Sequence, residues 1–230
     1  MSSIAENVAS VKERIARAAE RVGRNPEEIE ITAVAKTIEA GRIKEALEAG
    51  IQIIGENKVQ EALQKVRAVN GSVTWHMVGH LQRNKVKEAV RIFRLIQSLD
   101  SLRLAEEISS RALTSGTIMD VLVQVNTSQE ETKYGLESQE TIPFLREVSS
   151  LKGLSVRGLM TIGAFLPDPE AVRPCFRRLK ELRDEILGAS IPNIEMECLS
   201  MGMTNDFEVA IEEGATLVRI GTAIFGAREK

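Results

Sequence analysis

From residue 4 to residue 22, apolar side chains recur every three or four positions: Ile4, Val8, Val11, Ile15, Ala19 and Val22. This spacing places them on one face of an α-helix. Ser3 and Glu6 have the spacing of a capping box at its start, and Gly23 predicts its end. The pattern therefore predicts one amphipathic helix ahead of the rest of the chain.

After this helix, short apolar segments rich in β-branched residues alternate with segments of helical spacing. The predicted strands are residues 31–34, 51–54, 73–78, 94–97, 118–125, 154–160, 194–199 and 216–220. The predicted helices cover residues 39–49, 58–69, 81–90, 101–113 and 138–149, a segment around 176–186, and a last one that starts at 204 or 205 and ends before 214.

Strands that alternate with helices require right-handed crossovers and a parallel sheet. Eight such units in about 200 residues favour an α/β fold, a closed (β/α)8 TIM barrel with the N-terminal helix outside it. A doubly wound open sheet is the alternative. Because no linker, repeat or low-complexity segment divides the chain, we expect residues 1–230 to form a single domain.

Composition narrows the class of partner. The chain has 43% hydrophobic and 27% charged residues, and 30 Lys and Arg stand against 33 Asp and Glu, so no basic excess points to nucleic acid. No apolar run is long enough to span a membrane, and the N-terminal segment does not resemble a signal peptide. Two cysteines make neither a disulfide framework nor a zinc site. We expect a cytoplasmic protein without nucleic-acid, membrane or metal partners.

A lysine, Lys36, follows the first predicted strand, and active sites of such barrels lie at the C-terminal ends of the strands. Burial disfavours a charged amine, and an uncharged amine is a nucleophile toward carbonyl groups. Lys36 is therefore a candidate Schiff-base lysine. The alternative is a lysine whose amine simply reaches out into water.

The last two predicted strands end in residues suited to an anion. Loops at these positions commonly hold phosphate in TIM barrels. Gly202 and Gly221 allow close approach of backbone N–H groups, and Ser200 and Thr222 add hydroxyls. The helix predicted after Thr204 would add the positive end of its dipole. These features predict a phosphate cradle on the same rim as Lys36.

An amine and a phosphate cradle on one rim match the two ends of pyridoxal 5′-phosphate (PLP), and Arg219 is placed for a third contact at its pyridine nitrogen. Asn57 and His80 end the second and third strands. Each residue also has a structural alternative. The two glycines could serve turns only, and Ser200, Thr204 and Asn57 could cap helices. Arg219 could form an ion pair with Glu195 or Glu197, and His80 could be a hydrogen-bonded structural histidine. Three basic residues after His80 could form a solvated face: Arg83, Lys85 and Lys87.

Five segments match one family in order: Ala33-Val-Ala-Lys-Thr37, Gly55-Glu-Asn57, Trp75-His-Met-Val-Gly-His-Leu-Gln-Arg-Asn-Lys85, Leu199-Ser-Met-Gly-Met203 with Asp206, and Val218-Arg-Ile-Gly-Thr222 with Phe225-Gly226. The chain resembles the YggS/PROSC family, the pyridoxal phosphate homeostasis proteins. The likeness covers nearly the whole chain, and its third segment is the most specific.

The resemblance implies a barrel like the N-terminal domain of alanine racemase, with Lys36 holding PLP as an internal aldimine. It implies phosphate contacts from Ser200, Gly221 and Thr222, and Arg219 facing the pyridine nitrogen, where it would weaken the cofactor as an electron sink. Asn57 would be a pocket neighbour. The implied function is to carry and buffer the cofactor in intracellular vitamin B6 homeostasis, with no established catalysis.

Racemisation needs an acid–base group on each face of the substrate Cα. Lys36 can serve one face, whereas the only tyrosine, Tyr134, lies in a predicted polar loop at 126–135. The chain ends soon after the last strand, without room for the second domain that supplies a tyrosine in alanine racemases. We therefore expect a monomeric carrier that passes PLP to PLP-requiring apoenzymes. The alternatives are a small PLP-dependent racemase-like enzyme, using Lys36 with His80 or Tyr134, and an interaction protein regulated by its cofactor.

Overall fold

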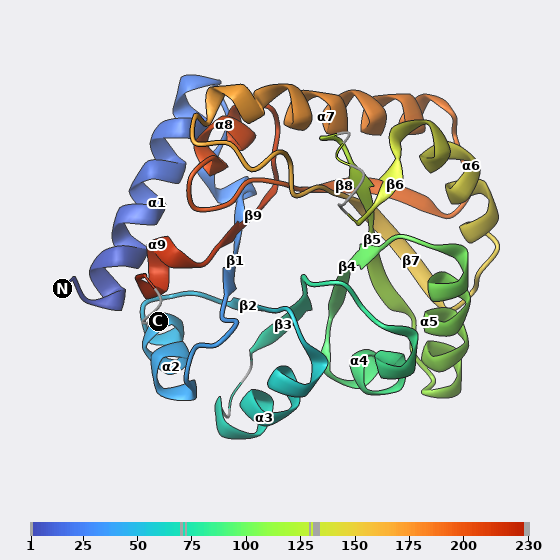
Figure 1. The fold of residues 1–230 in the computed structure, drawn as a ribbon, viewed down its shortest axis with the longest axis horizontal. Coiled ribbons are helices and arrows are strands. Elements are labelled where there is room, and N and C mark those ends of the chain that lie inside the picture. The colour runs from blue at the N-terminus through green and yellow to red at the C-terminus, as the bar shows by residue number, and fades with distance from the viewer. Residues whose placement is uncertain (1, 70, 72, 129, 131–133, 228–230) are drawn as a thin grey trace.

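Eight parallel strands close into a barrel in the computed structural model, which describes residues 2–69, 71, 73–128, 130 and 134–227. The barrel strands are β1 (Glu30–Val34), β2 (Ile53–Glu56), β3 (Thr74–Met77), β4 (Leu95–Leu99), β5 (Met119–Asn126), β7 (Leu154–Met160), β8 (Ile194–Ser200) and β9 (Leu217–Ile220). Their order is β4-β3-β2-β1-β9-β8-β7-β5, and β4 also pairs with β5. This last pairing closes the ring, so the predicted TIM barrel is confirmed over an open sheet (Figure 1).

Helices surround the ring of strands in Figure 1. They are α1 (Ile4–Arg21), α2 (Ala40–Glu48), α3 (Val59–Val69), α4 (Val86–Ile92), α5 (Leu102–Thr114), α6 (Ser138–Val148), α7 (Arg173–Gly188), α8 (Phe207–Glu212) and α9 (Thr222–Phe225), with 3-10 turns η1 (Pro26–Glu28), η2 (Arg83–Lys85) and η3 (Glu170–Val172). The predicted N-terminal helix is α1, and both hydrogen bonds of its capping box, between Ser3 and Glu6, are present. Its apolar face is buried, and it packs beside α8 and α9.

Some element boundaries differ from the prediction. Strand β2 begins two residues late, because the Ile51 N–H donates to the Ala46 carbonyl and still closes α2. The helix predicted at 81–90 starts as the 3-10 turn η2 before α4. A short strand, β6 (Leu136–Glu137), pairs with β5 and was not predicted. Residues 129 and 131–133 of the predicted loop at 126–135 lie outside the described residues.

The barrel interior is layered. Five side chains from five strands form an apolar cluster of their own: Ile53, Leu95, Leu122, Met160 and Leu217. Alternate residues of a strand face the same side. Gln97 and Arg219, two positions after Leu95 and Leu217, therefore also point inward, one layer nearer the C-terminal ends of the strands. A polar layer thus lies between the apolar interior and the rim.

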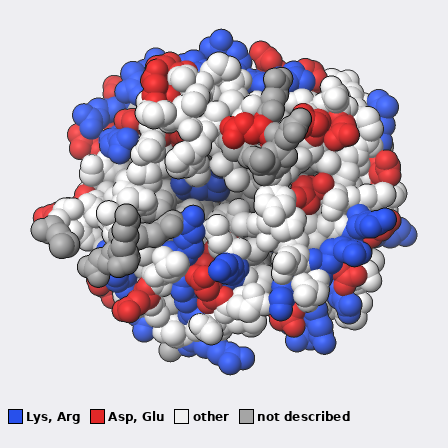
Figure 2. Space-filling model, in the orientation of Figure 1, with Lys and Arg blue, Asp and Glu red and all other residues white. Residues whose placement is uncertain are grey.

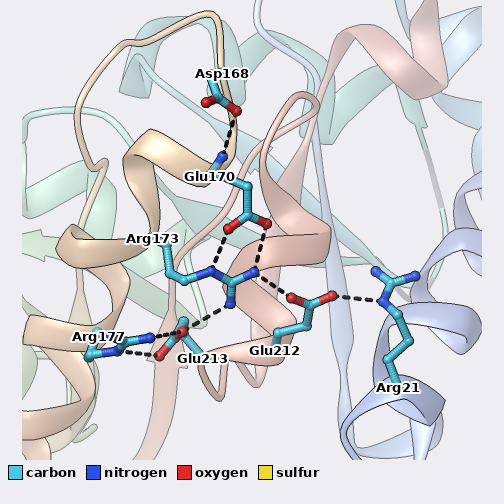
Figure 3. A network of polar contacts seen from close by, with 7 residues as sticks. All are labelled: Arg21, Asp168, Glu170, Arg173, Arg177, Glu212 and Glu213. Atoms are coloured by element: carbon cyan, nitrogen blue, oxygen red, sulfur yellow. Dashed lines mark hydrogen bonds and ion pairs between the residues drawn. The ribbon is translucent and has the colours of Figure 1, made fainter.

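The end of the β7–α7 connection is tied to α8 by a network of ion pairs (Figure 3). Arg173, at the start of α7, contacts Glu170 of η3 at 2.7 Å, Glu212 at 2.6 Å and Glu213 at 3.0 Å. Glu212 also reaches Arg21 of α1, at 2.7 Å. One guanidinium therefore links three segments on the outside of the barrel.

Over the described part of the chain, no helix is both long enough and apolar enough to cross a membrane. Within the same residues, His, Cys, Asp and Glu form no group of three or more that could hold a metal ion.

Candidate functional site

A pocket of about 580 Å³ opens at the C-terminal ends of the barrel strands. Five of the seven predicted site residues line it: Lys36, Asn57, Arg219, Gly221 and Thr222. Figure 2 shows the corresponding face hollowed near its middle, with basic side chains in the hollow. The structure therefore brings the lysine after β1 and the glycine turn after β9 to one rim, as the sequence predicted.

Lys36 is half-buried and follows Ala35, whose N–H donates to the Gly55 carbonyl at 2.9 Å. This bond extends the pairing of β1 with β2 by one residue, so the chain turns away only at Lys36. Apolar side chains of Val34 and Val78 share the pocket wall with it. The local structure thus places an amine at the edge of an apolar wall.

Arg219 lies in the polar layer and is only 5% exposed. Its Nη1 donates to Ser200 Oγ and its Nη2 to the Thr161 carbonyl, both at 2.6 Å. Burial lowers the pKa of Arg219 to about 10, and the nearby Asp206 opposes this shift. The guanidinium is therefore fixed in direction and still charged at neutral pH.

The structural alternative for Arg219, an ion pair with Glu195 or Glu197, is wrong. Both carboxylates pair with Arg157 instead. Their side chains are exposed on the outside of β8, whereas Arg219 points into the barrel. Alternation along the strands separates the two sets, because neighbouring positions face opposite sides of a sheet.

The phosphate contact predicted for the Ser200 hydroxyl stays a prediction, and the structure shows which partners this hydroxyl has within the protein. A serine hydroxyl has one proton to donate, and Ser200 gives it to Gln97 Oε1 at 2.7 Å while accepting from Arg219. Gln97 Nε2 lies 3.1 Å from His76 Nδ1, and burial lowers the pKa of His76 to about 4, so that ring is uncharged at neutral pH. Ser200 is thus part of a buried chain of hydrogen bonds that orients Arg219.

The close approach of Gly202 to the anion also stays a prediction, and neither it nor Ser200 is among the described residues that line the pocket. Gly202 has φ of +90°, and a Cβ there would lie 2.6 Å from Ala210 Cβ and 2.8 Å from Phe207 Cα. Its carbonyl accepts from the Arg219 N–H at 3.0 Å. Glycine is required here because α8 packs directly against this turn.

The helix start at the pocket is not the predicted one. Helix α8 begins at Phe207 rather than at 204 or 205, because the turn before it closes on Asp206, whose Oδ1 accepts from the Met203 N–H at 2.6 Å. At the rim, Gly221 is instead the N-cap of α9, which begins at Thr222. The Ala223 N–H donates to Thr204 Oγ1 at 3.3 Å, and the Ile224 and Phe225 N–H groups donate to the Gly221 carbonyl. Gly221 and Thr222, which both line the pocket, are therefore the residues of this turn whose amides are suited to an anion.

The two remaining strand-end residues differ in position. Asn57 lines the pocket, and because α3 begins at Val59, Asn57 does not stand at its N-cap. His80 Nδ1 lies 3.3 Å from Asp100 Oδ2, and its ring stacks on Tyr134 at a centroid distance of 4.1 Å. Of the described residues, neither His80 nor Tyr134 is in the pocket lining. This arrangement favours the structural alternative for His80.

Sequence reasoning missed part of the wall. The loop after β7 contributes four apolar residues, Ile162, Ala164, Phe165 and Leu166, and Phe165 is 83% exposed. The sequence analysis also did not identify Gln97 and His76, which hold Arg219 in place through the hydrogen bonds of Ser200. Polar residues at every second position of otherwise apolar strands are the signal that could have found them.

Comparisons with known proteins support one family. The family model described as "Alanine racemase, N-terminal domain" matches residues 6–229. A protein of Aquifex aeolicus (strain VF5) named pyridoxal phosphate homeostasis protein is 45% identical over 201 residues, covering 87% of each chain. A Pseudomonas aeruginosa protein of the same name is 41% identical over 235 residues, covering 100% of this chain and 97% of its own.

Two solved structures bear on the fold. PipY of Synechococcus elongatus PCC7942, determined with PLP bound, has a TM-score of 0.86 and 32% identity, covering 97% of this chain and 100% of its own. An alanine racemase of Clostridium difficile 630 has a TM-score of 0.74 at 16% identity, covering 98% of this chain and 57% of its own, so that likeness concerns the fold alone. The chain described here belongs to the family of pyridoxal phosphate homeostasis proteins, built on the barrel of the alanine racemase N-terminal domain.

Proposed function

We propose that this protein binds PLP and carries or buffers it in intracellular vitamin B6 homeostasis. One observation supports this most directly: a single pocket is lined by Lys36, by the buried Arg219 and by the turn at Gly221 and Thr222. The cofactor supplies an aldehyde carbon, with which an uncharged amine condenses to a C=N bond with loss of one water. Lys36 is the residue that would provide that amine.

The donor set of the pocket fits the rest of the cofactor. The amides of Gly221 and Thr222 and the Thr222 hydroxyl are suited to a phosphate. Arg219 can only donate a hydrogen bond, which suits an unprotonated ring nitrogen. Asn57 would contact the bound molecule from the end of β2, and Ser200 and Gly202 would contact its phosphate from the end of β8 and the turn that follows it. Ser200 also holds Arg219 in place, since it accepts from Nη1 of that residue.

We propose that the protein does not use the cofactor for catalysis. A guanidinium at the ring nitrogen keeps that nitrogen from taking up a proton, and this weakens the ring as an electron sink. His80 and Tyr134, the candidate second acid–base groups, contact each other and Asp100 rather than forming part of the described pocket lining. Asp206, which does line the pocket, accepts a hydrogen bond from the Met203 amide.

The proposal also covers domain organisation, oligomeric state, cellular location and the recipients of PLP. Residues 1–230 would act as one PLP-binding domain, as a monomer in the cytoplasm, and would pass the cofactor to PLP-requiring apoenzymes. The test is size-exclusion chromatography with light scattering, followed by activation of a PLP-free enzyme on addition of the loaded protein. A dimer in solution, or an apoenzyme activated no faster than by the same amount of free PLP, would contradict these points.

Covalent attachment is tested by absorbance before and after borohydride, with the modified peptide mapped by mass. Wild-type protein should absorb near the visible edge and carry the reduced adduct on Lys36. Lys36→Ala should lose both, with little change in the free energy of unfolding, because a half-buried residue at the barrel mouth is not core packing. Lys44→Ala, on the exposed face of α2, is the matched control and should behave as wild type. An adduct on another lysine would refute the assignment.

Absence of catalysis is tested by proton exchange at the Cα of a panel of amino acids in deuterated water. We expect exchange far slower than about 1 s⁻¹, the lower range of enzyme turnover. Exchange at that rate or faster, lost in Lys36→Ala, would establish a racemase-like enzyme instead.

A further inference from the structure

The turn that carries Lys36 is held from outside the barrel by two charged side chains of α3. Lys65 Nζ donates to the Ala35 carbonyl at 2.7 Å. Glu61 Oε2 accepts from the Thr37 N–H at 3.1 Å and lies 3.4 Å from Lys65 Nζ. The peptide groups on both sides of Lys36 are therefore fixed by one ion pair.

The backbone at this turn needs such support. Thr37 has φ of +65°, which is an uncommon and unfavourable conformation for a β-branched residue. Its hydroxyl donates to the Lys36 carbonyl at 2.6 Å, but the Thr37 N–H bonds to Glu61, which comes from another element. The turn is closed by its own Ile38 N–H, which donates to the Ala35 carbonyl at 2.9 Å, and the side chains of α3 add the remaining support for the peptide groups around Lys36.

A third charge fixes the position of Lys65. Glu56, the last residue of β2, is fully buried, and its Oε1 lies 2.5 Å from Lys65 Nζ. Burial raises the pKa of the Glu56 carboxyl, and the bond from Lys65 opposes that rise. Lys65 is therefore tied to β2 as well as to the turn, so α3, β1 and β2 meet at this one ammonium group.

We propose that Glu61 and Lys65 are positioning residues, which hold the turn so that the Lys36 amine faces the PLP aldehyde. This inference rests on the proposed function. Neither residue is among the described pocket-lining residues, so both act through Lys36. A purely structural role, in which the pair only fastens α3 to the barrel, would affect all ligands of the pocket alike.

Pyridoxamine 5′-phosphate separates the two possibilities, because it keeps the ring and phosphate but has an amine in place of the aldehyde and cannot condense with Lys36. Dissociation constants for both compounds are measured for wild type, Glu61→Ala and Glu61→Gln, together with the rate of borohydride trapping on Lys36. Glu45→Ala, an exposed glutamate of α2, is the matched control.

We expect Glu61→Ala to weaken PLP binding by about tenfold or more and to slow trapping, while changing pyridoxamine 5′-phosphate binding by less than about twofold. Glu61→Gln keeps an acceptor for the Thr37 N–H and should stay within about twofold of wild type for both compounds. It also provides a folded variant should Glu61→Ala not fold.

Equal losses for both compounds in Glu61→Ala, or a Glu61→Gln variant that departs from wild type, would overturn the positioning role. Failure of the proposed function gives a different result, because wild-type protein would then show no adduct on Lys36 in the first place.

Discussion

Acid should destabilise the protein through His76, which lies inside the barrel beneath the pocket. The residue is 5% exposed, and its Nδ1 lies 3.1 Å from Gln97 Nε2, an amide nitrogen that can only donate. A proton on Nδ1 would place two donors face to face, and burial penalises the charged ring in addition. The folded state therefore holds His76 neutral.

The magnitude follows from the pKa of His76, which burial lowers from 6.5 to about 4. This difference corresponds to about 3 kcal/mol in the free energy of unfolding. Because the folded-state pKa is the lower one, the unfolded chain binds the proton more tightly. The contribution of His76 is therefore complete above pH 6.5 and is lost as the pH falls toward 4.

Urea unfolding of wild type and His76→Asn between pH 7 and pH 4 measures this contribution. Asparagine does not titrate, and its amide oxygen can accept from Gln97, so the variant should be less stable at pH 7 but should lose less stability in acid. Buried carboxyls whose pKa is raised, such as Asp100 and Asp206, act equally in both proteins and cancel in the difference. Parallel stability curves over this range would refute the assignment of a neutral buried His76.

Two further predictions concern stability. Gly202→Ala should lose about 2–4 kcal/mol of unfolding free energy, because φ is +90° and the added Cβ would meet Ala210 and Phe207. The control Gly41→Ala in α2 has open space around it and should be neutral or gain up to about 1 kcal/mol. Thermal melts of the two variants check both values, and equal melting temperatures would contradict the packing argument. Arg173→Met should lose about 1–3 kcal/mol of unfolding free energy, because it removes the guanidinium that contacts three carboxylates in Figure 3. The control Arg178→Met, at a more exposed arginine, should lose about 0–1 kcal/mol. Denaturant unfolding at low and high salt measures both losses, and equal losses would mean that the network does not stabilise the protein.

The sequence predicted the barrel well because its evidence is local. Each strand is a short apolar run and each outer helix has an apolar stripe, so periodicity alone separates them. Where the outcome depended on individual hydrogen bonds rather than on periodicity, prediction failed. Strand β6 exists only because the chain at Leu136 returns to pair with β5, and the start of α8 at Phe207 depends on a bond from Met203 to Asp206. Neither contact changes the spacing of hydrophobic residues along the sequence, so periodicity could not predict it.

The candidate site shows the same division. Lys36 and Gly221 could be placed on one rim, because both follow barrel strands and all strands of such a barrel point the same way. Ser200 could not be assigned its partners, since its proton goes to Gln97, which is 103 residues away in sequence. Gly202 was identified as a special position from its residue type, whereas the close packing of α8 against it is visible only in the structure.

The support beneath Arg219 bears on whether the pocket holds a cofactor or uses it. Two of its donors are engaged by Ser200 and Thr161, so the guanidinium cannot turn away from the pocket without leaving buried acceptors unpaired. With a pKa of about 10 it does not give up a proton at neutral pH, so in the proposed complex it would donate a hydrogen bond to the ring nitrogen without protonating it. In that complex the ring would be held in one position and would be a poor electron sink, as we expect of a carrier. Replacing Arg219 alone should not create a catalyst, because racemisation needs a second acid–base group besides Lys36. Among the other described residues that line the pocket, Asp206 is the ionisable one, and its Oδ1 accepts a hydrogen bond from the Met203 amide.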